Sequence, residues 1–404
     1  MEAFNAIGTR LKSAWQREHF EETAFHELAV DALRTSDLAG QLSLRDVLDY
    51  VQTAGTLPTQ ADFPFGKPIT VFSDPKFYID VLTWIDGTTA IHEHGFSGAF
   101  MVLEGSSLHA RYRFESSRRY NPHLHLGRTS LRELELLRVG DVRPIQAGAE
   151  SAHALFHLDR PSVSLVVRTP KSHEFSVQLQ YLRSGIAYNP FHEDIQAQRL
   201  IRTLEIMREL DDPAFLDRTR RLMEERDAFT AFKIADYLSR KLDFEAYRDF
   251  MTAKPHAHRE LFDALIPHIH DARREANLVE RRHSVKEESH RFLLALLLNL
   301  RGTADILGMV AARCPSADPV NTIMTWISEL STLPAINRDE PNAIGIELDD
   351  IAKDLMTSML HGASDHEAIE KLRAEYEDVD ELRSGLIELC SAVRESVFFG
   401  SLFA

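Results

Sequence analysis

Cysteine is almost absent from this chain of 404 residues, which contains only Cys314 and Cys390. Two cysteines so far apart argue against a disulfide framework and a cysteine-rich metal site, and they suit a reducing compartment. We expect both to be structural. Long apolar runs are lacking as well: the longest, Phe292 to Leu298, is far shorter than the roughly 20 residues that a membrane-spanning helix needs.

Positive charge is also in deficit. The chain has 46 basic and 62 acidic residues, a formal net charge of −16, which argues against nucleic acid or an anionic membrane as the main partner. The first residues, MEAFNAIGTRLKSAW, lack the apolar core and the cleavage site of a secretory signal. We therefore expect a cytoplasmic protein with neither nucleic acid nor a membrane as partner.

The chain does have enough apolar residues, 44%, for a large core, and enough length for two or three domains. Residues 1–60 are predicted to form an N-terminal helical segment. Its apolar residues recur at helical spacing, as in Phe4, Ile7, Leu11 and Trp15. Ser43 and Asp46 are spaced as a capping box at the start of a further helix. The Pro- and Gly-containing stretch TLPTQADFPFGKP then marks a boundary.

Residues 61–188 have the pattern of strands. FYIDVLTW, FSGAFMVLEG, SLHARYRF, SVSLVVRT and EFSVQLQY are short, rich in β-branched and aromatic residues, and separated by turn signals. Several such strands without intervening helices predict a sandwich or a small barrel.

Residues 189–404 are predicted to form a helical domain of unknown role. The run FLLALLLNL is apolar on all sides, which predicts a helix buried in a bundle. Asp318 followed by Pro319 is typical of a helix start. Two amphipathic helices are expected after Ile346. The whole chain is therefore predicted to be an α+β protein.

Among 19 histidines, the pair His92 and His94 stands out because it opens a predicted strand. Residues i and i+2 of a strand point to the same face, so both imidazoles can reach one ion. Two ordinary histidines at an exposed strand end are the alternative. A second such pair, His123 and His125, lies in what we expect to be a loop. His268 and His270 lie in a predicted helix, where their side chains diverge.

The sequence around the pair resembles the cupin superfamily. IHEHGFSGAFMVLEG is similar to the first cupin motif, with Gly98 at the position of the usual acidic ligand. GDVRPIQAGAESAHALFH is similar to the second, which makes His153 the third ligand and His157 an alternate or outer ligand. This resemblance implies a cupin-type antiparallel β-barrel flanked by the N-terminal helical segment and the large C-terminal helical domain.

Within the cupins, the loss of the acidic ligand resembles the thiol dioxygenases over about residues 67–181. That resemblance implies Fe(II) on three histidines and the addition of O2 to a small thiol, giving a sulfinate. The outer residues of that family fall on Ser164, Val166 and Arg168, so only the serine is kept. Arg168 is predicted to receive an anionic group of the substrate, and Lys67 aligns with the family's carboxylate-binding arginine. A surface position is the alternative for Arg168.

Two other functions stay open at this point. The barrel can be a cupin metalloenzyme that oxidises a non-thiol small molecule or a peptide, because cupins host many reactions. It can also be a non-enzymatic ligand sensor, with the helical domain binding a partner or a second copy of the chain as a homo-oligomer.

Overall fold

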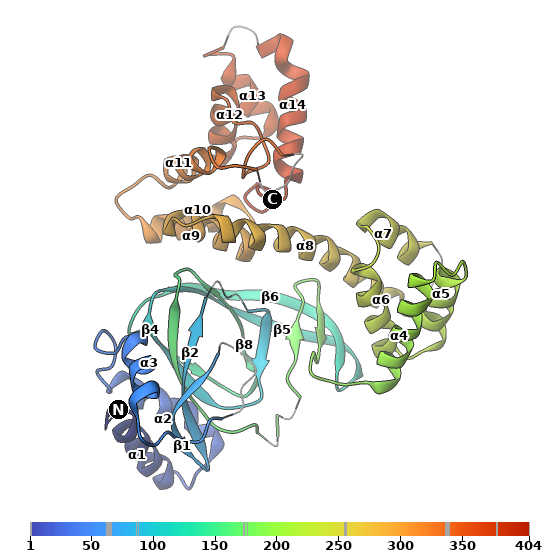
Figure 1. The fold of residues 1–404 in the computed structure, drawn as a ribbon. Coiled ribbons are helices and arrows are strands. Elements are labelled where there is room, and N and C mark those ends of the chain that lie inside the picture. Colours follow the sequence, from blue (N-terminus) through green and yellow to red (C-terminus); the bar gives the residue numbers. More distant parts are fainter. Residues whose placement is uncertain are drawn as a thin grey trace. The chain divides into compact units, whose positions relative to one another are not determined.

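The computed structural model describes residues 2–61, 67–85, 87, 89–172, 174–175, 177–253, 257–335, 340–376 and 379–403. It divides into two compact units, Met1–Asp271 and Ala272–Ala404. The first unit contains all the strands and is drawn in blue to yellow-green in Figure 1. The predicted α+β class, with an antiparallel β-barrel and helices before and after it, is confirmed.

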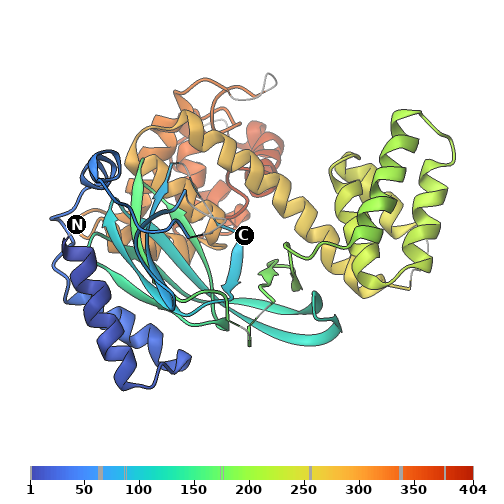
Figure 2. The same ribbon diagram turned by 60° about the horizontal axis from the view of Figure 1, so that its bottom comes forward.

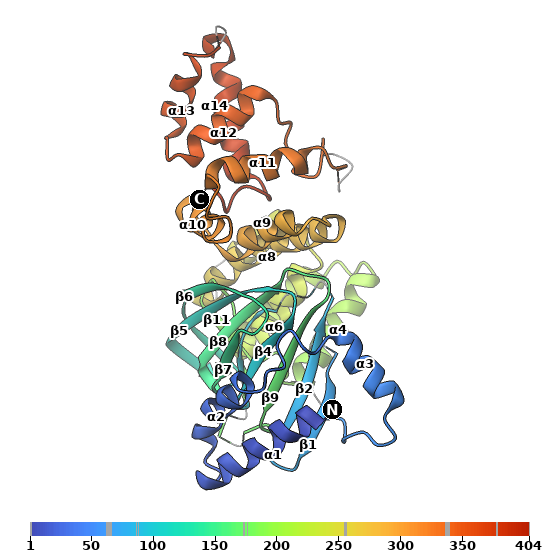
Figure 3. The ribbon, with the colours of Figure 1, turned by 90° about the vertical axis from the view of Figure 1, so that its left-hand side faces the viewer.

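Three helices precede the strands: α1 (Glu2–Arg17), α2 (Glu22–Arg34) and α3 (Leu44–Thr53). The apolar stripe predicted for α1 is buried, and the predicted capping box of Ser43 and Asp46 starts α3. α1 and α2 pack their apolar faces on the outer side of a β-sheet, below the barrel in Figure 3. The N-terminal segment therefore closes one face of the barrel and leaves the interior to other residues.

Among the described residues, eleven strands follow in chain order. They are β1 (Ile69–Asp74), β2 (Phe77–Trp84), β3 (Ile91–His94), β4 (Gly98–Glu104), β5 (Ser107–Asn121), β6 (Leu124–Leu137), β7 (Val142–Ile145), β8 (Gly148–His157), β9 (Ser162–Arg168), β10 (Gln180–Tyr181) and β11 (Ile186–Tyr188). One sheet has the order β1-β2-β9-β4-β7, and the second closes on itself in the order β10-β11-β6-β5-β8-β3. An apolar cluster with members from both sheets, Phe100 of β4 and Leu155 of β8 among them, fills the space between them.

The strands β5 and β6 form a long hairpin that the sequence predicted only in part. The stretch containing His123 and His125 was expected to be a loop, but only a short turn is found there and His125 lies in β6. Most residues of β6 are exposed or half-buried on both faces, so their polarity carries no alternating signal. The expectation for EFSVQLQY was wrong in length, because its described part has only the two residues of β10 in a strand.

The tip of this hairpin packs on helices of the same unit, as Figure 2 shows. These are α4 (Ile195–Glu209), α5 (Phe215–Glu225), α6 (Ala228–Ser239) and α7 (Phe244–Thr252). Leu124 at the tip and Ile186 of the neighbouring β11 are buried in one cluster with Phe229 and Phe232 of α6. α8 (Arg259–Ser284) begins in the first unit and ends in the second.

The second unit is helical in its described residues. It contains α9 (Glu288–Asn299), α10 (Thr303–Arg313), α11 (Pro319–Ser331), α12 (Asp350–Leu360), α13 (Asp365–Leu372) and α14 (Val379–Glu395). The predicted buried helix is confirmed as α9, and Asp318 caps α11 as expected. The two helices expected after Ile346 are in fact three. No helix in the described part of the chain is both long and apolar enough to cross a membrane.

Candidate metal centre

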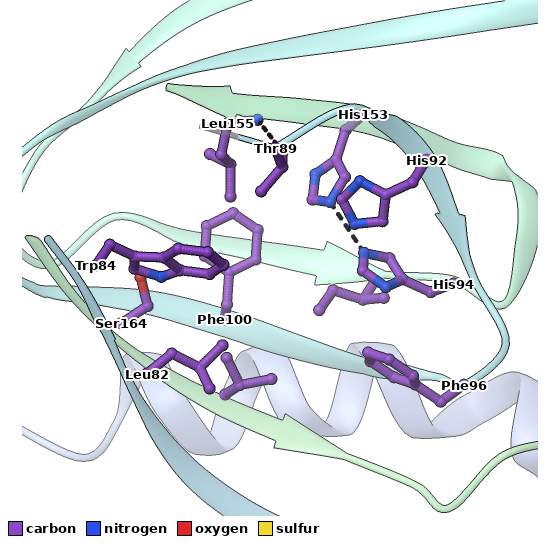
Figure 4. A pocket seen from close by; sticks show the side chains of 12 residues that line it. Leu82, Trp84, Thr89, His92, His94, Phe96, Phe100, His153, Leu155 and Ser164 are labelled. Carbon is purple, nitrogen blue, oxygen red and sulfur yellow. Dashed lines mark hydrogen bonds between the residues drawn. The ribbon is translucent and has the colours of Figure 1, made fainter. Parts of the chain in front are cut away.

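Three imidazoles meet inside the barrel at the place that the sequence indicated. His92 and His94 come from β3 and His153 from β8, and all three are buried. One ligand nitrogen from each can be chosen so that all lie within 4.8 Å of one another. Figure 4 shows the rings converging at one end of a cavity. Among the described residues this is the only such group of metal-binding side chains.

The pairing of β3 with β8 produces this convergence. His92 lies opposite His153, whereas His94, only two residues later, lies opposite Gly148. β8 therefore carries an irregularity between these two pairings, and the strand bends around the site. The spacing of His92 and His94 was visible in the sequence, but their register with His153 was not.

The three histidines are held in the neutral form that binds metals. Burial lowers the pKa of His92 and holds the pKa values of His94 and His153 well below the usual range. The other imidazoles lower them further, because neighbouring positive charges repel. A metal ion therefore meets deprotonated ligands at neutral pH.

The donor set fits one divalent ion. Nε2 of His94 lies 2.9 Å from Nε2 of His153, close to the separation of about 3 Å expected for adjacent ligands on an ion bound at 2.0–2.1 Å. Nδ1 of His92 donates to the carbonyl oxygen of Ala90 at 2.9 Å, which places the proton of this neutral imidazole on Nδ1. Nδ1 of His94 is buried without a hydrogen-bond partner.

No acidic side chain can complete this set from the first cupin motif. A Cβ atom at Gly98 would lie 2.0 Å from the carbonyl oxygen of Val167, so β4 and β9 approach too closely for any side chain there. The backbone therefore excludes an acidic ligand at this position. A divalent ion held by three neutral imidazoles would keep its full positive charge.

A chain of buried and half-buried hydrogen bonds extends outward from His153. Nδ1 of His153 lies 2.8 Å from Nε2 of His109 on β5, and Nδ1 of His109 lies 2.8 Å from Oε1 of Glu135 on β6. Arg143 on β7 donates to both carboxylate oxygens of Glu135, with Nε at 2.8 Å from Oε1. These three residues were not predicted from the sequence. Their only local signal was a histidine in a predicted strand, because the chain depends on the pairing of β5 with β6 and β8.

A small cavity opens beside the three imidazoles (Figure 4). It measures about 50 Å³, room for a few water molecules at about 10–15 Å³ each. Its other lining residues come from both sheets: Leu82, Trp84, Thr89, Phe96, Phe100, Ile145, Leu155, Ser164 and Val166. None of the lining residues is acidic, lysine or arginine, so the cavity favours a small and mostly apolar occupant.

A second, polar pocket of about 150 Å³ also reaches His153. Its remaining lining residues are His109, Arg111, Arg143, Pro144, Gln146 and Ser151. Arg111 forms an ion pair with Glu133 at 2.9 Å. His153 thus lines both an apolar cavity and a polar one.

Of the other four residues singled out in the sequence, one lines the cavity and three do not. Ser164 lines it. Arg168 does not: its Nε donates to Asp80 at 2.7 Å in a buried ion pair, and its guanidinium lies over the ring of Phe96, which lines the cavity. Lys67 is exposed and does not line it either. His157 lies outside the three-histidine group, bonded to Ser107 at 2.9 Å and stacked on Trp84.

No protein-family model matches the sequence, and no curated protein is significantly similar to it. Parts of the chain are similar to solved structures. A DMSP lyase, DddQ from Ruegeria pomeroyi, is 12% identical over 44% of this chain and 96% of its own, with a TM-score of 0.23. A hydroquinone 1,2-dioxygenase from Sphingomonas is 12% identical over 28% and 69%, with a TM-score of 0.22. A sugar phosphate isomerase of the cupin superfamily from Silicibacter pomeroyi is 17% identical over 28% and 68%, with a TM-score of 0.18. These likenesses are partial and assign no activity to this chain.

Proposed function

We propose that this chain is a non-haem iron oxygenase whose substrate is a small molecule with an apolar body and one ionisable donor atom, a small thiol being the first candidate. The observation that carries the proposal is the set of three buried, neutral imidazoles without a carboxylate ligand at the end of an apolar cavity. Iron as the metal rests on the resemblance to the thiol dioxygenases.

The charge of the site favours an anionic donor. Three neutral ligands leave a divalent ion with its full charge, and the lining offers no acidic group to balance it. A thiolate would supply that balance through the donor atom itself. A ferrous ion held here would lower the pKa of the thiol and supply the redox chemistry that O2 requires.

The protein's own contribution is orientation and exclusion of water. The hydroxyl of Thr89 accepts a hydrogen bond from the amide of Leu155 at 2.8 Å, which fastens the segment before β3 to β8 beside the ligands. Trp84, Phe96 and Phe100 form apolar walls. A cavity of this size admits a small thiol, or one short side chain of a peptide, with little water beside it.

The reaction with a thiol needs no further reductant. A thiolate and O2 combine to a sulfinate: both oxygen atoms form bonds to sulfur, sulfur is oxidised by four electrons, and O2 is reduced by the same four. A second substrate or an electron donor therefore needs no site of its own. This balance favours the thiol over a non-thiol substrate whose oxidation would require an added reductant.

The lining also predicts which thiols react. Arg168 is bonded to Asp80 and does not line the cavity, so the described lining holds no cation for a substrate carboxylate. We expect ethanethiol to be a better substrate than cysteine or 3-mercaptopropionate, measured as O2 uptake with the iron-loaded protein. O2 uptake with a small phenol, but with none of the thiols, would instead indicate a non-thiol substrate. Metal binding without O2 uptake on any of them would overturn the oxygenase assignment and favour a ligand sensor.

Metal analysis tests the centre itself. His94→Ala removes one of three ligands, and we expect iron content after anaerobic loading to fall from about one ion per chain to almost none. His157→Ala is the matched control, because His157 is buried nearby but lies outside the group, and it should keep its iron. Full iron content in His94→Ala would contradict the assignment of a metal site to these histidines.

A further inference from the structure

We propose that His109 is a positioning residue of the metal centre: with Glu135 and Arg143 it fixes the proton of His153 on Nδ1 and so keeps Nε2 free to bind the ion. The inference rests on the proposed metal site and goes beyond it, because it assigns a role to residues that do not touch the metal.

The hydrogen bonds that link His153, His109 and Glu135 have one consistent direction. The outer end is Glu135, which as a carboxylate only accepts, so Nδ1 of His109 carries the proton that is donated to Oε1. In a neutral imidazole, Nε2 of His109 is then without a proton and accepts from Nδ1 of His153, 2.8 Å away. With its proton on Nδ1, His153 presents a bare Nε2 toward His94. The tautomer of His153 is thus set by Glu135, which acts through His109.

Arg143 keeps the outer end of the chain ionised. It donates to both oxygens of Glu135 and is itself only partly exposed. Burial alone would raise the pKa of Glu135, but the hydrogen bonds from His109 and Arg143 outweigh it and lower the pKa to about 2. A protonated Glu135, which could reverse the direction, is therefore absent at neutral pH.

The opposite tautomer would block the site. A proton on Nε2 of His153 would point at Nε2 of His94, 2.9 Å away, in the space that the ion needs. His109 and His153 are both buried, at 3% and 6% exposure, and the hydrogen bond that they share is buried as well. Partners of this kind typically change metal affinity by about 10- to 100-fold.

Anaerobic titration with Co2+ tests the role, because visible absorption reports both affinity and ligand strength. We expect His109→Leu to weaken Co2+ binding by about 10- to 100-fold and to shift the absorption bands of the bound ion. His109→Gln should restore most of the affinity, since its amide can accept from His153 and donate to Glu135. His290→Gln is the matched control: His290 is also buried and bonded to a glutamate, at 2.7 Å, but lies in the other unit.

Glu135→Gln keeps the volume and removes the charge that sets the direction of the chain. It should weaken Co2+ binding and shift the bands, while a residue needed only for folding would lower the melting temperature and leave the bands of the bound ion unchanged. Wild-type affinity and bands in both Glu135→Gln and His109→Leu would overturn the inference, and Glu135→Gln alone decides it if His109→Leu does not fold. Failure of the wild-type chain to bind Co2+ or iron would instead overturn the metal site.

Discussion

At the scale of single residues, Trp84 forms one wall of the cavity and so limits its size. Its indole lines the cavity on one side and stacks on His157 on the other, with ring centroids 4.5 Å apart. The ring is therefore fixed in place by a partner that the substrate does not touch. Shape selection at this wall depends on one side chain.

Trp84→Phe should widen the accepted range of substrates. A phenyl ring is smaller than the indole, and one methylene of fit in an apolar pocket changes kcat/KM by about tenfold or more. We expect the ratio of kcat/KM for butanethiol over ethanethiol to rise by about that factor, measured as O2 uptake. Trp326→Phe, in a buried helix of the second unit, should leave the ratio unchanged. An unchanged ratio in Trp84→Phe would show that another residue limits the cavity.

The grouping of the three histidines was predictable from sequence because its signals are local. His92 and His94 are two residues apart on one strand, and His153 follows a recognisable glycine and proline pattern. His109 and Glu135 had no such signal, since they meet only when β5 and β6 pair in a particular register. The hydrogen-bonded residues that support a site are therefore harder to predict from sequence than the residues of the site itself.

At the scale of elements, β10 is attached to β3 through a buried carboxylate. Glu93 lies between two ligands and accepts from the hydroxyl of Tyr181 and, at 2.9 Å, from the amide of Leu179. Burial raises the pKa of Glu93, and these two hydrogen bonds oppose that rise. A strand of two residues is thereby held against the strand that carries the site.

Tyr181→Phe should loosen that attachment. The substitution keeps the ring and leaves Glu93 with one donor fewer in a buried place, which costs about 1–3 kcal/mol of unfolding free energy. Urea unfolding measures the cost, and faster hydrogen exchange at the Leu179 amide would locate it. Tyr188→Phe is the control, because its hydroxyl bonds a neutral amide, Gln180, at 3.0 Å. Equal effects of the two variants would contradict a special role for the carboxylate.

Elements with strong local signals were predicted well. The capping box at Ser43 and the cap at Asp318 both start helices as expected, since side chain and amide lie within three residues. β6 was missed because its residues face water on both sides for most of its length. Its position is decided by pairing with β5, which is a long-range property.

At the scale of the whole molecule, the metal centre belongs entirely to one compact unit. The three ligands, the hydrogen-bonded chain behind His153 and both pockets lie within Met1–Asp271. The second unit has its own buried apolar residues, among them those of α9 and α11. Every residue assigned to the candidate site thus belongs to the first unit.

A fragment of residues 1–284, which keeps α8 whole, should therefore bind Co2+ like the full chain. We expect the same absorption bands and an affinity that differs less than that of any ligand variant. Circular dichroism and thermal unfolding establish that the fragment is folded. A folded fragment without Co2+ binding would show that the second unit contributes to the centre.

The close approach of β4 and β9 at Gly98 has a consequence for how such a protein can change over time. Because even a methyl group would collide with the Val167 carbonyl, no single codon change can add a carboxylate at this position. A fourth ligand would first require the two strands to separate. Descendants of this chain can therefore diversify by altering cavity walls and outer partners much more easily than by altering the number of ligands.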